Sequence, residues 1–117
     1  MIYASGSEVW VAREAAQKIS QMRNIRVWVV SVVCWLWFEE QDEQYRELIL
    51  QKNVHARVSI EAGSTLGWQR FTGMDGLNIG VDGFGHSAPA EALAAHFGLL
   101  PEQVANRIGD YLNRLSA

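Results

Sequence analysis

The sequence predicts an α/β fold in which a parallel sheet of about four strands carries helices on both faces. Short apolar, β-branched segments alternate with segments whose apolar residues recur at helical spacing. Glycine, proline and helix-capping residues stand at the boundaries between these segments. The chain has 117 residues, of which 49% are apolar and 20% charged, so we expect one globular domain over residues 1–117.

Four segments are expected to form the strands. They are rich in apolar or β-branched residues and are bounded by turn-forming residues. The segment from residue 25 to residue 33 is the longest and has the composition of a buried strand. In chain order the four are Ile2–Ser5, Ile25–Val33, Ala56–Ala62 and Leu77–Val81.

The first helix is expected to begin after Ser7, a good N-cap, and to end at Asn24. Trp10 lies on the opposite side of this helix from the apolar stripe, so we expect it to face solvent or a partner. The stripe that should be buried consists of Val9, Ala12, Ala16 and Ile19.

Three further helices are expected. The segment Glu39–Leu50 should be one helix, and Pro89–Phe97 a second that stops at Gly98. The last helix should begin at Pro101, with Val104, Ile108, Leu112 and Leu115 on one apolar stripe. For the helix over residues 39–50, the residues available for an inner face are Phe38, Tyr45, Leu48 and Ile49.

Composition and charge exclude several classes of protein. The formal net charge is −3 and the ten Lys and Arg residues are scattered, which does not fit nucleic-acid binding. The longest apolar run, Val27–Phe38, is shorter than the ~20 residues that cross a membrane. Met1 leads directly into a strand-like segment without a signal peptide, and the single Cys34 fits a reducing cytoplasm.

The sequence contains no strong catalytic or metal-binding motif. The glycine-rich run Gly80–Gly85 lacks the spacing of a phosphate-binding loop and is expected to be a tight turn. Neighbours in sequence such as Asp82, His86 and Ser87 rarely form a catalytic triad. The three histidines, His55, His86 and His96, are not spaced from Cys34 or from a carboxylate residue as metal ligands usually are. We therefore expect no catalytic, cofactor-binding or metal-ligating residue.

Short segments along nearly the whole chain are similar in sequence to a known family. Together they resemble the C-terminal domain of transketolase, in the style of the plant and cyanobacterial enzymes. The run from residue 56 to residue 90 is the most specific part. The segments are Ala4–Val9, Arg26–Ser31, Cys34-Trp35, Phe38–Gln41, Tyr45–Glu47, Ala56–Thr65, Gly67-Trp68, Asp82, Phe84-Gly85 and Ser87–Ala90.

The resemblance implies a three-layer α/β/α sandwich with a mixed five-stranded sheet. In that family an antiparallel strand lies beside the strand that corresponds to Ile25–Val33. This chain is expected to start after that antiparallel strand, which would leave Ile25–Val33 as an uncovered sheet edge. Transketolases hold thiamine diphosphate and a divalent metal in two preceding domains. The resemblance therefore implies a domain without cofactor or catalysis of its own.

Five positions depart from the family pattern, mostly toward larger apolar side chains. Trp10 and Trp28 stand where the family usually has polar or basic residues, and Val33 replaces a usual proline. Leu36 replaces an acidic or polar residue, and Trp37 a smaller one. Several of them map to the carboxyl ends of neighbouring strands, and tryptophan is enriched at interface hot spots. We interpret the five as an engineered interface.

The expected function is that of a non-catalytic interaction module that forms a homodimer through the exposed strand over residues 25–33. Two alternatives stay open. The chain is a natural fragment of a split transketolase that needs its cofactor-binding domains, or it is a designed small-molecule binder. The predicted protein is cytoplasmic, with no cofactor, no nucleic acid and no membrane among its partners.

Overall fold

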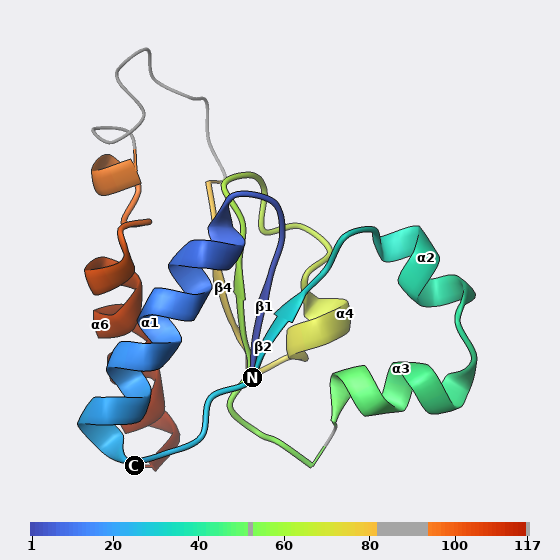
Figure 1. Cartoon of the computed structure of the whole chain (residues 1–117), viewed down its shortest axis with the longest axis horizontal. Coiled ribbons are helices and arrows are strands. Elements are labelled where there is room, and N and C mark those ends of the chain that lie inside the picture. The colour runs from blue at the N-terminus through green and yellow to red at the C-terminus, as the bar shows by residue number, and fades with distance from the viewer. Residues whose placement is uncertain (52, 82–93, 117) are drawn as a thin grey trace.

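The computed structural model describes residues 1–51, 53–81 and 94–116, which form three layers with a sheet in the middle (Figure 1). The sheet has four strands in the order β2-β1-β3-β4, and every pairing is parallel. This confirms the predicted α/β class, and β2 lies at an edge as expected. The strands are β1 (Ile2–Ala4), β2 (Val29–Ser31), β3 (Val58–Ile60) and β4 (Leu77–Ile79).

Helices cover both faces of the sheet (Figure 1). One face packs against α1 (Glu8–Arg23) and α6 (Pro101–Ser116). The opposite side of the molecule carries α2 (Trp35–Glu40), α3 (Glu43–Leu50) and the short α4 (Gln69–Thr72). The three-layer α/β/α sandwich is therefore confirmed.

The larger core lies between the sheet and the helices α1 and α6. Alternate strand residues point into it, and the predicted α1 stripe of Ala12, Ala16 and Ile19 is buried there, whereas Val9 is half-buried. Asn24 ends α1 in the left-handed conformation, with φ 53°, as predicted. The strand and α6 residues that complete this core are Ile2, Ala4, Val58, Ile60, Ile79, Val104, Ala105, Ile108 and Tyr111.

A smaller aromatic core lies on the other face. The rings of Trp35 and Trp68 meet edge to face with centroids 5.1 Å apart, and Phe38 lies 4.9 Å from Phe71. Trp68 is buried, and its indole N–H donates to the Glu61 carboxylate at 2.6 Å. These contacts hold α2 against the segment that contains α4.

The predicted strand over residues 25–33 is too long. Only Val29–Ser31 pairs, because β1 is the neighbour of β2 in the sheet and contributes just Ile2–Ala4. Trp28 therefore precedes the strand and Val33 follows it.

The predicted helix over residues 39–50 is broken into α2 and α3. Asp42 starts α3, because its side chain accepts a hydrogen bond from the Tyr45 amide at 2.8 Å while Gln41 is extended. The expected inner face is also wrong in part, since Tyr45 and Leu48 are exposed. The aromatic residues beside α4 fill the space over the sheet, and α3 lies to the side of it (Figure 1).

Two other helix boundaries differ from expectation or lie partly outside the described residues. Ser7 makes no capping hydrogen bond, because its hydroxyl donates to the neighbouring Glu8 carboxylate instead. Of the expected helix Pro89–Phe97, residues 94–96 are helical and 89–93 are not described. Gly98 follows with φ 74°, in agreement with the expected stop.

Gly67→Ala should destabilise the protein and displace α2. Gly67 has φ 88°, and a Cβ at this position would lie 2.5 Å from the Trp35 ring. The left-handed backbone alone costs a non-glycine residue about 1–2 kcal/mol, and the ring must also move. Chemical unfolding followed by tryptophan fluorescence measures both effects. Gly63→Ala is the matched control, because a Cβ at Gly63 would meet only the flexible Glu61 side chain, at 3.8 Å. Equal stability of the two variants would contradict this packing.

Candidate interaction surface

The outer side of β2 offers unpaired backbone groups. The Ile2 amide donates to the Trp28 carbonyl at 2.7 Å, and the Val32 amide donates to the Ala4 carbonyl at 2.8 Å. Since backbone groups alternate along a strand, the N–H and C=O groups of Val29 and Ser31 point away from β1. Among the described residues no strand pairs with that side.

Large apolar side chains surround this edge. Four of the five predicted interface residues lie within two residues of β2 or on α2, and all four are exposed: Trp28 (58%), Val33 (80%), Leu36 (61%) and Trp37 (61%). The fifth, Trp10, is 53% exposed, as its helical position predicted. It lies on α1, in the helical layer on the other face of the sheet from α2 (Figure 1).

A cleft of about 350 Å³ opens between β2 and the helices α2 and α3. Its floor comes from the strand and the segment that follows, and its walls come from aromatic side chains of both helices. The size lies within the range of ligand and side-chain pockets. We name it the β2–α2 cleft, and it is lined by Val30, Ser31, Val32, Val33, Cys34, Trp37, Phe38, Gln41, Tyr45, Ile49 and Phe71.

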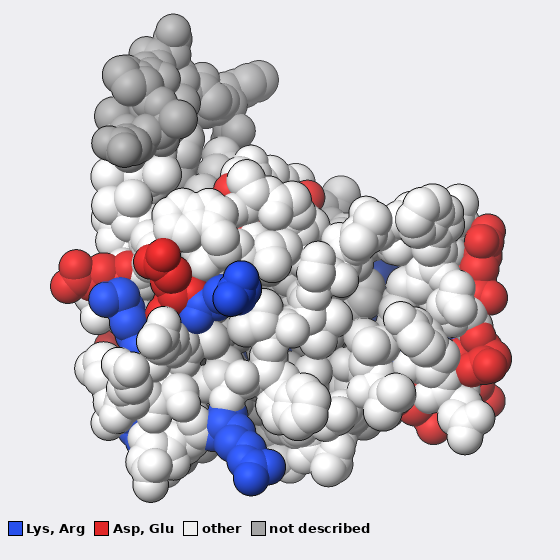
Figure 2. All heavy atoms as spheres, in the orientation of Figure 1, with Lys and Arg blue, Asp and Glu red and all other residues white. Residues whose placement is uncertain are grey.

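Charge is distributed unevenly on this side of the molecule. Figure 2 shows acidic side chains gathered over α2 and α3, charges of both signs over α1, and few charges in the strip over β2 between them. One acidic residue, Glu39, pairs with Arg70, whose guanidinium lies 4.7 Å from the Trp35 ring centre. This pair ties α2 to α4 across the aromatic core.

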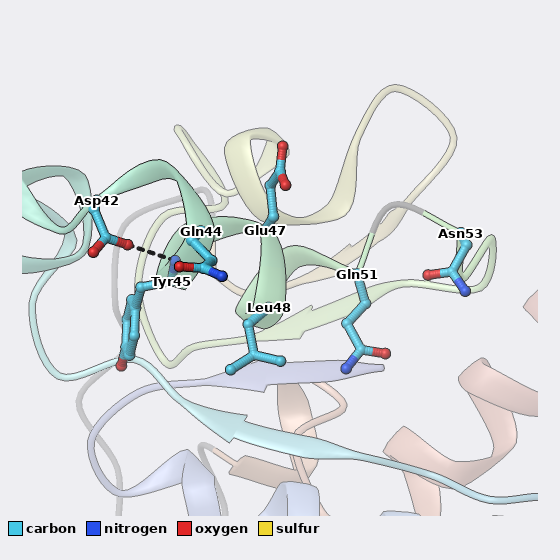
Figure 3. A pocket seen from close by; sticks show the side chains of 7 residues that line it. All are labelled: Asp42, Gln44, Tyr45, Glu47, Leu48, Gln51 and Asn53. Carbon is cyan, nitrogen blue, oxygen red and sulfur yellow. Dashed lines mark hydrogen bonds between the residues drawn. The ribbon is translucent and has the colours of Figure 1, made fainter.

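A second hollow, of about 880 Å³, runs along α3 (Figure 3). Tyr45, Leu48 and Gln51 point to one side of the helix, while Glu47 points to the other. The lining side chains belong mostly to exposed positions of one short helix and the turn after it. They do not converge on a common point, so the hollow lacks the convergent polar groups of a binding site.

The described residues contain no group of three or more His, Cys, Asp or Glu side chains able to hold a metal ion. No helix among them is long and apolar enough to cross a membrane. His55 and His96 are exposed on separate parts of the chain. Asp82, His86 and Ser87, with most of the glycine-rich run, lie outside the described residues.

Tyr3 positions one wall of the cleft. Its buried hydroxyl shares one donor hydrogen between the carbonyl oxygens of Ile49 and Leu50, at 3.0 and 3.1 Å, and so ties the end of α3 to the central strand β1. Burial raises the pKa of the Tyr3 phenol, and the nearby Arg57 opposes that shift only in part. The phenol therefore stays protonated and continues to donate above its usual titration range.

Sequence reasoning missed how the cleft is built. Trp35 and Phe38 anchor α2, yet their partners Trp68 and Phe71 lie more than thirty residues further along the chain. The Gly67-Trp68 pair was the available signal, because glycine beside a large aromatic residue often marks close packing.

The comparisons with known proteins identify the family. The family profile described as "Transketolase-like TK C-terminal domain" matches residues 1–100. Transketolase 7 of Craterostigma plantagineum is 48% identical over 104 residues, which cover 89% of this chain and 15% of that protein. The chain belongs to the transketolase family and corresponds to its C-terminal domain. It spans about 15% of the length of this relative.

Solved structures agree with the fold. A transketolase from Pichia stipitis, crystallised with xylulose 5-phosphate, superposes with a TM-score of 0.88 at 31% identity, covering 98% of this chain and 16% of that chain. A structure described as a split gene transketolase, an inactive beta4 tetramer, has a TM-score of 0.72. It covers 96% of this chain and 38% of that chain, and at 21% identity it shows the fold alone.

Tyr3→Phe should destabilise the protein at neutral pH by about 1–2 kcal/mol, because the carbonyl groups of Ile49 and Leu50 lose the one O–H that they share. The raised pKa of Tyr3 has a further consequence. Its stabilising effect is complete below the unfolded-state value near pH 10 and is lost as pH rises through the higher folded-state value. The free energy of unfolding of the variant should therefore fall less steeply at alkaline pH. Urea unfolding across alkaline pH tests this, with Tyr45→Phe as control, and parallel curves for parent and Tyr3→Phe would contradict it.

Proposed function

We propose that this chain is a non-catalytic interaction module, a transketolase C-terminal domain that associates with a second copy of itself through β2. The observation that carries the proposal is the outer side of β2, with which no strand in the described part of the chain pairs, beside exposed Trp28 and Trp37. An antiparallel strand from a second copy satisfies the outward N–H and C=O groups of Val29 and Ser31. A twofold axis lets each copy do the same for the other.

The available apolar area suits a small homodimer. Four tryptophan side chains, two from each copy and more than half exposed, contribute roughly 350–600 Å² when covered. Val33, Leu36 and the strand backbones bring the total toward the ~1,200 Å² at the lower end of specific interfaces. Trp10 would lie at the margin of such an interface, on α1.

The origin of this surface is a separate part of the proposal. Exposed tryptophans concentrated at one sheet edge are what a domain redesigned for self-association would carry. The engineered origin and the cytoplasmic location expected from the sequence stay predictions.

The length of the relatives favours a second candidate. Because the chain corresponds to about 15% of a transketolase, the same edge would also suit docking to the remainder of such an enzyme. Ketol transfer would then require the other domains. Co-sedimentation with a transketolase that lacks its C-terminal domain separates this candidate from self-association.

The parent chain should sediment as a dimer at high concentration and as a monomer on dilution. Trp37→Glu places a charge in the interface, and Ser31→Pro removes an outward N–H without touching the β1 ladder. Both variants should sediment as monomers in analytical ultracentrifugation, with circular dichroism to verify the fold. Met74→Glu, at a fully exposed position away from β2, is the control and should remain dimeric. A parent that stays monomeric, or variants that behave like the parent, would overturn the proposal.

The chain alone should not bind the transketolase cofactor. By family resemblance, the thiamine diphosphate and metal sites belong to domains other than the one matched by residues 1–100. Calorimetric titration with thiamine diphosphate and Mg²⁺ should show no saturable heat. Saturable binding at micromolar cofactor would refute the non-catalytic assignment.

A further inference from the structure

We propose that the β2 strands of two copies pair with Val30 opposite Val30 across the twofold axis, and that Trp28 of each copy then inserts into the β2–α2 cleft of the second copy. The inference rests on the proposed self-association and adds to it a register and a specific anchor residue. Its occupant is a second copy of this chain.

The register follows from the outward backbone groups of β2. Residues with outward N–H and C=O groups face each other as hydrogen-bonded pairs in an antiparallel ladder. Three twofold registers pair such residues: Val29 with Val29, Val29 with Ser31, or Ser31 with Ser31. Only the second satisfies the outward groups of both residues within β2, because the other two need partners outside the strand. That register places Val30 opposite its own copy.

The same register carries Trp28 to the cleft. Val27 and Val29 pack on the α1 side of the sheet, whereas Val30 packs on the opposite side. Since side chains alternate, Trp28 faces the side that carries the cleft. Trp28 of one copy then lies opposite Val32 of the second copy, and the Val32 side chain lines the cleft.

The cleft suits an indole ring. Its volume is about 350 Å³, and Trp37, Phe38 and Tyr45 are among the aromatic residues in its lining. Aromatic rings pack well edge to face or offset, and buried tryptophans dominate many interfaces. Gln41 also lines the cleft, and its side-chain carbonyl oxygen can accept a hydrogen bond from the indole N–H.

Charge is complementary in this arrangement. Arg26 is exposed and forms no ion pair among residues 1–51, 53–81 and 94–116, and antiparallel pairing brings it toward the segment of the second copy that follows β2. Cys34 precedes α2, and the acidic residues Glu40 and Glu43 follow at the α2–α3 turn. Antiparallel pairing thus brings a basic segment toward the acidic end seen in Figure 2, and the twofold axis repeats this contact.

Single cysteines report the register. In the Cys34→Ser background, Val30→Cys should form an intermolecular disulfide under mild oxidation, because opposed residues of a non-hydrogen-bonded pair have Cα atoms about 4.5 Å apart. Val29→Cys and Ser31→Cys are the matched controls. Each lies one diagonal step from its own copy, at about 7–8 Å or more, too far for a disulfide. Cross-linking at Val29→Cys or Ser31→Cys instead of Val30→Cys would overturn the register while leaving self-association intact.

Truncating the Trp28 side chain tests whether it binds in the β2–α2 cleft of the second copy. Trp28→Ala should raise the dimer dissociation constant by about tenfold or more, and Trp28→Phe should restore part of the affinity. Met74→Ala should leave the constant unchanged. If parent and Trp28→Ala have the same dimer dissociation constant, the insertion of Trp28 into the β2–α2 cleft is wrong, but the register and the self-association still stand. If the parent forms no dimer, this inference and the proposed function both fail.

Discussion

The edge-to-face contact between Trp35 and Trp68 is the interaction on which the surface beside β2 depends. Helix α2 has six residues and none is fully buried, so it has no core of its own to hold it. Its place is fixed where Trp35 meets Trp68 and where Phe38 meets Phe71. The indole of Trp68 is in turn held by the Glu61 carboxylate at the end of β3. A short helix is thereby coupled to the centre of the sheet.

The short central strand imposes a second constraint. Because β1 has three residues, β2 pairs over three residues, and beyond it only the Trp28 carbonyl and the Val32 amide still bond to β1. Parallel sheets usually bury their strands beneath helices on both faces. Here α1 covers one face of the sheet at β2. On the opposite face, α2 and α3 do not cover β2 completely, and a cleft remains between them and the strand. The exposed tryptophans are a consequence of this geometry as well as of composition.

Much of the fold could be predicted from local pattern, but the candidate site could not. Helical spacing identified α1 with its end at Asn24 and placed Trp10 on the exposed side. β-branched composition located all four strands, although it overestimated the length of β2. The sequence did not predict the break at Asp42, because acidic residues occur both in the first turn of a helix and in its interior. Only the hydrogen bond from the Tyr45 amide to the Asp42 side chain shows that a new helix starts here. The cleft depends on contacts between segments more than thirty residues apart, which periodicity does not report.

The smaller core explains why these tryptophans stay outside it. Tyr3, Trp68 and Phe71 are fully buried there, and Trp35 and Phe38 already pack against them. Close-packed interiors do not accept another large ring without strain, so Trp28 and Trp37 cannot be absorbed by rearrangement within one chain. Their apolar area costs about 25 cal/mol for each Å² left in water. The second copy proposed above would cover part of that area at the edge of β2, and its extended backbone would satisfy the outward groups of the strand at the same time.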